Sequence, residues 1–301
     1  MEIDRVELKH QARERMALTD PKFWVVALTY LAMTIGVSWL ISLIPVPGGA
    51  DPVPQSNTFH LFFQLLLTLY RTVVNFGLCL WALWTYRQLD PGLNSLIQGF
   101  SVAGRVLLME VGIYFRILGW YFLTAVGLSI PMFILLMAPI NSMVGMIFIY
   151  LFVAALFLSL ISIALRYALA PYLMADRPDD GPSAPIYRSV LLMRGWKMQL
   201  FKLEFSYIGY EIANLLFSML VILFFLNQAG LLSSDIILSE EWRVQCLDVI
   251  YSTPVVILST LVTVPVSLWL LPYRAVARAG FYDARILAAS QEEHNPQMPP
   301  L

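Results

Sequence analysis

The chain has 301 residues, of which 59% are hydrophobic and 13% charged, and its formal net charge is −1. Soluble domains average about 45–50% apolar and about 25% charged residues. This chain is too apolar and too poor in charge to cover a water-exposed surface, which excludes a soluble globular protein. The near-zero net charge gives no indication of a nucleic-acid partner, and we expect none.

Six stretches of the chain are long and apolar enough to cross a bilayer as helices. A helix needs about 20 residues to cross about 30 Å of hydrocarbon. The six stretches are 23–44, 60–84, 117–138, 143–165, 205–226 and 253–271. We predict an all-α, polytopic membrane bundle of about six transmembrane helices in three helical hairpins, with cytoplasmic amphipathic helices and the lipid bilayer as its partner.

The basic residues are sorted into alternate connections between these stretches. The N-terminal segment, the connections after the second and fourth stretches and the C-terminal tail hold nearly all Lys and Arg residues. The three intervening connections contain a single basic residue, Arg243. Because Lys and Arg are enriched in cytoplasmic loops, we predict a multi-pass protein with both termini in the cytoplasm.

One unit is repeated three times, over about 1–88, 89–170 and 180–285, within a single integral membrane domain of residues 1–290. Each unit has a cytoplasmic helix, a tight turn with a basic residue, and a pair of spans. The three helices are expected at 2–17, 93–102 and 184–194. Residues 291–301 are expected to form a disordered cytoplasmic tail.

The turns of the repeated unit carry recognisable capping residues. In the first turn, Asp20 is predicted to be the N-cap of the first span and Pro21 its first helical residue. In the third turn, Gly195 is expected to adopt the left-handed conformation that follows many helices.

The third cytoplasmic helix is amphipathic. Ile186, Val190 and Met193 fall on one face, with Arg188 on the opposite face. Such a helix either lies at the membrane interface or packs beneath the bundle. Packing is the favoured interpretation.

Four polar residues fall within the apolar stretches. Arg71 and Asn75 lie in the second stretch, and Glu211 and Asn214 in the fifth. A charge in the bilayer usually faces a partner or a cavity, and we expect Arg71 to contact Glu211 or Asn214. The four residues are either an intramembrane polar site for an ion or anionic ligand, or a structural contact between helices, which is the favoured alternative.

The chain carries no motif for nucleotide binding, serine hydrolysis or zinc-dependent proteolysis. We therefore expect no enzyme activity, no catalytic residue, no metal site and no cofactor. The acidic residues Asp176, Asp179 and Asp180 stand among proline and glycine, which is more typical of a solvated turn than of a metal site.

The most distinctive stretch is 160–210. It contains Arg166-Tyr167-Ala168-Leu169-Ala170-Pro171-Tyr172, Asp176-Arg177-Pro178, Arg194-Gly195-Trp196-Lys197 and Phe205-Ser206-Tyr207-Ile208-Gly209-Tyr210. It resembles a bacterial integral membrane family known only as a domain of unknown function, numbered nine hundred and seventy-five. It is also distantly similar to the membrane region of some glycerophosphodiester phosphodiesterases. Arg177, Glu204 and Tyr210 depart from the family pattern, Glu204 being an unusual charge.

The resemblance implies a polytopic protein of the bacterial cell membrane and assigns no activity. From the residues themselves, Pro171-Tyr172 is expected to end the fourth helix at the interface. A basic belt of Arg188, Arg194, Lys197 and Lys202 is expected near the cytoplasmic surface. Such a belt is either the ordinary enrichment of basic residues on the cytoplasmic side, which is the more common case, or a binding surface for anionic lipid headgroups.

Three functions are compatible with these features. The favoured one is a non-enzymatic scaffold, accessory subunit or lipid-interacting protein, whose partners are anionic lipids or another membrane protein. The second is a small-molecule transporter or export component that uses the intramembrane polar site. The third and least favoured is an intramembrane enzyme that modifies lipid.

Overall fold

The computed structural model describes residues 4–42, 58–89, 91–137, 142–232 and 240–294, and these residues form helices and turns without a strand. The helices are α1 (Arg5–Ala17), α2 (Phe23–Leu31), η1 (Ala32–Gly36), α3 (Val37–Ser42), α4 (Thr58–Tyr86), α5 (Asn94–Gln98), η2 (Gly99–Val102), α6 (Ala103–Met137), α7 (Ser142–Leu165), α8 (Ala170–Asp176), α9 (Ser183–Leu192), α10 (Lys197–Phe205), α11 (Ile208–Gln228), α12 (Glu240–Ile250) and α13 (Thr253–His294). Six helical segments are long and apolar enough to cross a membrane. The predicted all-α membrane fold is confirmed.

The long helices extend beyond the apolar stretches that predicted them. Helix α13 has 42 residues, and at 1.5 Å per residue it is about 63 Å long, twice the thickness of the hydrocarbon layer. It reaches His294, past the predicted start of the tail at 291, and residues 295–301 lie outside the described part of the chain. Hydropathy marks where a helix leaves lipid, whereas α13 continues because its polar half also packs against protein.

Two predicted helix ends are wrong. Helix α2 begins at Phe23 with Lys22 as its N-cap, and Asp20 does not cap it. The fourth span ends at Leu165, and Pro171 lies in the first turn of the separate helix α8. A proline in the first turn replaces an N–H group that has no helical partner, so Pro171 starts a helix here instead of ending one.

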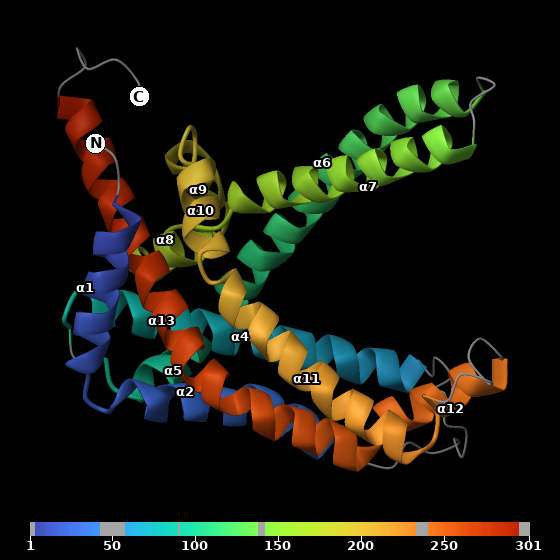
Figure 1. The fold of residues 1–301 in the computed structure, drawn as a ribbon. Coiled ribbons are helices and arrows are strands. Elements are labelled where there is room, and N and C mark those ends of the chain that lie inside the picture. The colour runs from blue at the N-terminus through green and yellow to red at the C-terminus, as the bar shows by residue number, and fades with distance from the viewer. Residues whose placement is uncertain (1–3, 43–57, 90, 138–141, 233–239, 295–301) are drawn as a thin grey trace.

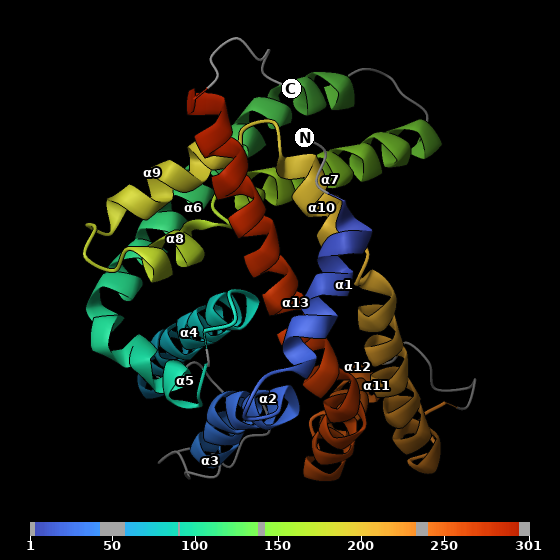
Figure 2. The same ribbon diagram turned by 90° about the vertical axis from the view of Figure 1, so that its left-hand side faces the viewer.

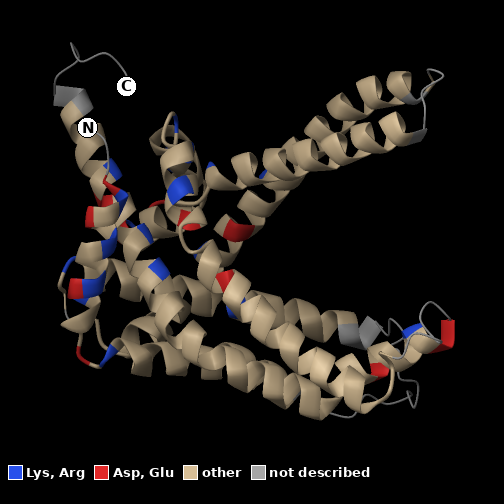
Figure 3. Cartoon of the chain, in the orientation of Figure 1, with Lys and Arg blue, Asp and Glu red and all other residues tan. Residues whose placement is uncertain are grey.

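Lys, Arg, Asp and Glu gather at one end of the molecule, which we call the charged end (Figure 3). It comprises α1, the C-terminal end of α4, helices α8–α10 and the C-terminal half of α13. Arg243 lies on α12 at the opposite end. The sorting of charge that the sequence predicts is therefore present in the fold.

The hydrophobic core lies at the charged end, where the short helices pack between the long ones. Trp81, Tyr273 and Phe281 are almost completely buried there, together with Leu8 of α1 and Leu200 of α10. A second cluster joins α4 and α6 to the residues around α8 and α9. The short helices predicted in the connections thus build the core.

From this core the apolar helices extend in two groups. Helices α6 and α7 pack along one another and diverge from the group of α2, α4, α11 and α13 (Figures 1 and 2). No residue in the apolar windows of α6 and α7 is buried, and side chains such as Phe133 are exposed. Their surfaces therefore suit lipid, while the arrangement of all six spans as three hairpins across a bilayer stays a prediction.

Helix α1 is fixed to the core by cations that stack on aromatic rings. The Lys9 ammonium lies 4.6 Å from the centre of the Tyr207 ring, and the Arg15 guanidinium 3.8 Å from that of Tyr86. Nε of Arg13 donates a hydrogen bond of 3.1 Å to the hydroxyl of Tyr273. The charged N-terminal helix is thereby attached to α4, to the N-cap residue of α11 and to α13.

Helix α9 packs against the hydrophobic core through its apolar face, as the favoured interpretation of this amphipathic helix predicted. Ile186 and Met193 are buried in the two core clusters, whereas Arg188 on the other face pairs with Asp180. After the helix, Gly195 has a φ of +80°, which confirms the left-handed turn.

Candidate functional site

A pocket of about 370 Å³ opens between α2, α4, α8, α11 and α13. Three of the four residues of the predicted polar site line it, namely Asn75, Glu211 and Asn214. Arg274 and Arg278 of α13 line it as well. The fold thus brings together most of the predicted site but supplies its positive charge from a different helix.

Glu204 at the end of α10 holds both arginines in place. Nε of Arg274 donates to Oε2 of Glu204 at 2.5 Å, and Nε of Arg278 donates to Oε1. Only 14% of the Glu204 side chain is exposed. Burial alone would raise the pKa of this carboxyl, but the charges and hydrogen bonds of the two arginines outweigh it and lower the pKa below 4.5. Glu204 is therefore ionised and fixes two guanidinium groups one helical turn apart.

Glu211 carries a carboxylate that is less fully engaged. Its Oε1 accepts one hydrogen bond of 3.3 Å from Nη1 of Arg274, and 52% of its side chain is exposed. Among the described residues, Oδ1 of Asn214 is buried and has no hydrogen-bond partner. The pocket therefore has an acidic side, formed by Glu211 and supplemented by the neutral amide oxygen of Asn214, and a basic side formed by Arg278.

The expected contact between Arg71 and Glu211 or Asn214 is wrong. Nη2 of Arg71 donates to Oγ of Ser38 on α3 instead, and Glu211 pairs with Arg274. The physical reason is that α13 continues as a helix past the end of its apolar stretch at 271. This continuation places Arg274 beside Glu211, although the sequence pattern predicted that the last span ends at 271.

Sequence reasoning therefore missed Arg274 and Arg278 as pocket residues and Glu204 as the acid that holds them. Two signals were available. Arg274 and Arg278 are four residues apart, so they share one helix face. Glu204 was recognised as an unusual charge within an apolar context, which is where an acid needs a basic partner.

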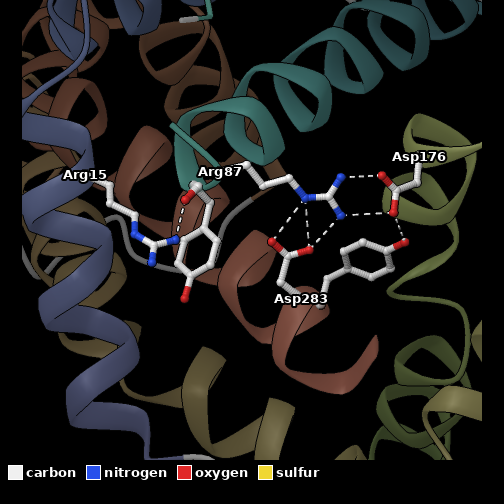
Figure 4. A network of polar contacts seen from close by, with 6 residues as sticks. Arg15, Arg87, Asp176 and Asp283 are labelled. Atoms are coloured by element: carbon white, nitrogen blue, oxygen red, sulfur yellow. Dashed lines mark hydrogen bonds and ion pairs between the residues drawn. The ribbon is translucent and has the colours of Figure 1, made fainter. Parts of the chain in front are cut away.

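A second polar network ties the helices together at the charged end (Figure 4). The guanidinium of Arg87 binds Asp176 of α8 and Asp283 of α13, the latter over 2.7 Å. The hydroxyl of Tyr282 donates to Asp176 at 2.8 Å. On the neighbouring α1, Arg15 donates to the backbone carbonyl of Tyr86. The network joins four helices and leaves its acids fully engaged, which is typical of a structural ion-pair network.

The acidic residues after α8 each pair with an arginine. Asp179 lies 3.2 Å from Arg105, and Asp180 lies 2.5 Å from Arg188. The interpretation of this segment as a turn holds, but its acids connect α8 to α6 and α9. Among the described residues, no group of three or more His, Cys, Asp and Glu side chains is placed to hold a metal ion.

The predicted basic belt is divided by the structure. Arg188 is paired with Asp180, whereas Arg194 and Lys202 are exposed. Lys197 lies near Arg166, and burial together with the charge of Arg166 lowers the pKa of the Lys197 ammonium. Arg166 itself lies over the Trp120 ring, 5.4 Å from its centre.

The fold and the pocket define a class of protein: an all-helical, multi-pass membrane protein with a polar pocket between its spans. A family model described as "Protein of unknown function (DUF975)" matches residues 1–289, and the chain belongs to this family. No curated protein and no solved structure matches the chain. The expected distant similarity to the membrane region of glycerophosphodiester phosphodiesterases is therefore not shown.

Proposed function

We propose that this protein is a non-enzymatic membrane protein that interacts with lipid through a basic surface at the foot of α6 and α7. This surface, the basic foot, consists of Arg166, Arg194, Lys197 and Lys202. The observation that carries the proposal is that none of these four cations forms an ion pair with a carboxylate among the described residues, and that Lys197 lies near Arg166. An anionic headgroup between the two cations would remove their repulsion.

The surroundings of the basic foot suit the rest of a lipid. Helices α6 and α7 expose apolar side chains above it, and Trp120, 49% exposed, marks the boundary between the two regions. Tryptophan favours the membrane–water interface because its ring is amphipathic. Acyl chains would lie along the exposed helices while the headgroup meets the cations, each of which contributes about 1 kcal/mol near an anionic surface.

One cation of the predicted belt already has an acidic partner and is not expected to bind lipid. The carboxylate of Asp180 already neutralises Arg188, so it has little charge left for a headgroup. Three of the four residues in the predicted belt, Arg194, Lys197 and Lys202, therefore remain as contributors. This difference supplies a control within the same surface.

The test is the amount of phosphatidylglycerol that copurifies with the protein from mixed-lipid nanodiscs, measured by mass spectrometry. The triple variant with Arg194→Gln, Lys197→Gln and Lys202→Gln should retain several-fold less of this lipid than the wild type, whereas Arg188→Gln should match the wild type. Arg243→Gln at the opposite end serves as a second control. Equal retention by the triple variant and the wild type would refute the proposal.

The same proposal places the charged end on the cytoplasmic side of a bacterial cell membrane, with both termini inside. The sorting of Lys and Arg supports this orientation. In a background without native cysteines, Asp179→Cys should resist a membrane-impermeant thiol reagent added to intact cells, and Glu240→Cys should react. Both wild-type side chains are exposed, at 98% and 79%. Labelling of the cysteine at position 179 from outside would reverse the orientation.

A further inference from the structure

We infer that the pocket between α2, α4, α11 and α13 binds a small zwitterion, with its anionic group against Arg278 and its ammonium group against Glu211. This inference goes beyond the proposed contact with anionic headgroups, because it uses different residues and a ligand of different charge. Three independent features of the pocket support it: its charge balance, the spacing of its charges and a buried oxygen without a partner.

The charges of the pocket cancel. Arg274 and Arg278 of the lining supply two positive charges, and two negative charges balance them, one from Glu211 of the lining and one from Glu204, which lies outside the lining and pairs with both arginines. A net charge is costly in a site of low polarity, so a ligand with a net charge would disturb this balance. A zwitterion carries both signs and leaves the total at zero.

The charges are also separated in space. Arg274 binds Glu204 with Nε and Glu211 with Nη1, so it is engaged on both sides. Arg278 uses Nε for Glu204, and among the described residues its terminal amino groups make no hydrogen bond. Arg278 lies one turn further along α13 than Arg274, so its Cα atom is offset by about 6 Å along the helix axis from that of the arginine that binds Glu211. A ligand that bridges Arg278 and Glu211 across an offset of this order has opposite charges separated by two or three carbon atoms.

Asn214 gives the acidic side a second acceptor. Its Oδ1 is buried and has no hydrogen-bond partner among the described residues. Leaving a buried acceptor unsatisfied costs about 1–3 kcal/mol. An ammonium group carries three donors, so one group can bind both the carboxylate of Glu211 and the amide oxygen of Asn214.

The volume of the pocket limits the ligand. About 370 Å³ lies at the lower end of the range of ligand pockets, roughly 300–1,000 Å³. This volume suits a phosphoethanolamine group or a short amino acid. The same chemistry occurs in the headgroup of a phosphatidylethanolamine lipid and in a free, water-soluble zwitterion, and the experiment distinguishes these two sources.

The experiment uses the full-length protein in nanodiscs of phosphatidylglycerol alone, with the melting temperature as the readout. One arm titrates soluble glycerophosphoethanolamine, a phosphodiester with no net charge, with glycerol phosphate as an anion that lacks the ammonium group. The second arm replaces a third of the lipid with phosphatidylethanolamine. We expect a saturable rise in melting temperature in at least one arm. A rise in the first arm identifies a free ligand, a rise in the second alone identifies a lipid headgroup, and both support the inference.

Variants assign the effect to the pocket. Glu211→Gln removes the acceptor charge but breaks only one long, exposed ion pair, so the protein should fold and bind the zwitterion about tenfold more weakly. Asn214→Leu tests the same side if Glu211→Gln proves unstable, and Arg278→Lys tests the anionic side. Glu240→Gln at the opposite end is the matched control.

Three results would overturn the inference. The first is no stabilisation by either source of the zwitterion. The second is equal stabilisation by glycerol phosphate, which would indicate a simple anion site. The third is binding that Glu211→Gln and Asn214→Leu leave unchanged. None of these results bears on the basic foot, since Arg194, Lys197 and Lys202 are intact in every variant.

Discussion

Replacement of Glu204 by Gln should destabilise the protein strongly, although it changes a single atom of the side chain. The carboxylate of Glu204 accepts hydrogen bonds from Nε of both Arg274 and Arg278 and is largely buried. Glutamine keeps the size and one acceptor oxygen but has no charge. Among the described residues, the variant would leave Arg278 without an acidic partner and Arg274 with Glu211 alone.

The magnitude follows from the burial of the three side chains. Removing one partner of a fully buried ion pair costs about 3–5 kcal/mol. The two arginine side chains are 36% and 38% exposed, so water screens part of the uncompensated charge. We therefore expect a loss of about 2–3 kcal/mol in the free energy of unfolding, which lies between the large cost for a buried ion pair and the small cost for an exposed one.

The assay is unfolding of the purified protein in mild detergent by increasing amounts of dodecyl sulfate, followed by circular dichroism. Glu211→Gln is the matched control, because Glu211 contacts the same Arg274 at 3.3 Å but is half-exposed. We expect the control to lose less than about 1 kcal/mol. If Glu204→Gln is no less stable than Glu211→Gln, the reasoning from burial is wrong.

The other predictions concern pH, backbone packing and the network at the charged end. Folding lowers the pKa of Glu204, so its contribution to the free energy of unfolding is present above the ordinary pKa of 4.5 and is lost as the pH falls through the folded pKa. The difference in melting temperature between the wild type and Glu204→Gln should therefore persist at pH 5 and shrink only below pH 4.5. Gly77→Ala should lower the free energy of unfolding by about 1–3 kcal/mol in the dodecyl sulfate assay, because the added Cβ atom would lie 2.4 Å from a backbone oxygen of α5. At Gly127 an added Cβ atom meets no neighbouring atom within 4 Å, so Gly127→Ala should cause no loss. Arg87→Gln should lower the melting temperature in detergent by several degrees, because it leaves Asp176 and Asp283 without their shared cation. Arg105→Gln removes an exposed ion pair and should leave the melting temperature unchanged within a degree. Equal shifts for the two variants would contradict the structural importance of this network.

Part of the candidate site could be predicted from the sequence. Asn75, Glu211 and Asn214 were recognisable because polar residues in apolar stretches are costly unless they share a partner or a cavity, and all three line one pocket. The identity of their basic neighbour could not be predicted. Arg71 lies in the middle of α4 and Arg274 lies just beyond the apolar stretch of α13, and only the packing of α11 against α13 decides which one reaches Glu211.

The sequence by itself determined the properties that depend on neighbouring residues along the chain. The apolar stretches gave the membrane class, the basic connections gave the charged end, and Gly195 gave a left-handed turn. Each of these is a local consequence of solvation or of backbone sterics.

Only the tertiary structure decided where the helices end, where the core lies and which charges meet. Helix α13 continues well past its apolar stretch because packing against α1 and α4 stabilises its polar half, and hydropathy cannot detect such packing. This continuation brings Arg274 and Arg278 to Glu204, about 70 residues earlier in the chain. Ion pairs between distant segments depend on the angles and depths at which helices pack, which local patterns do not encode.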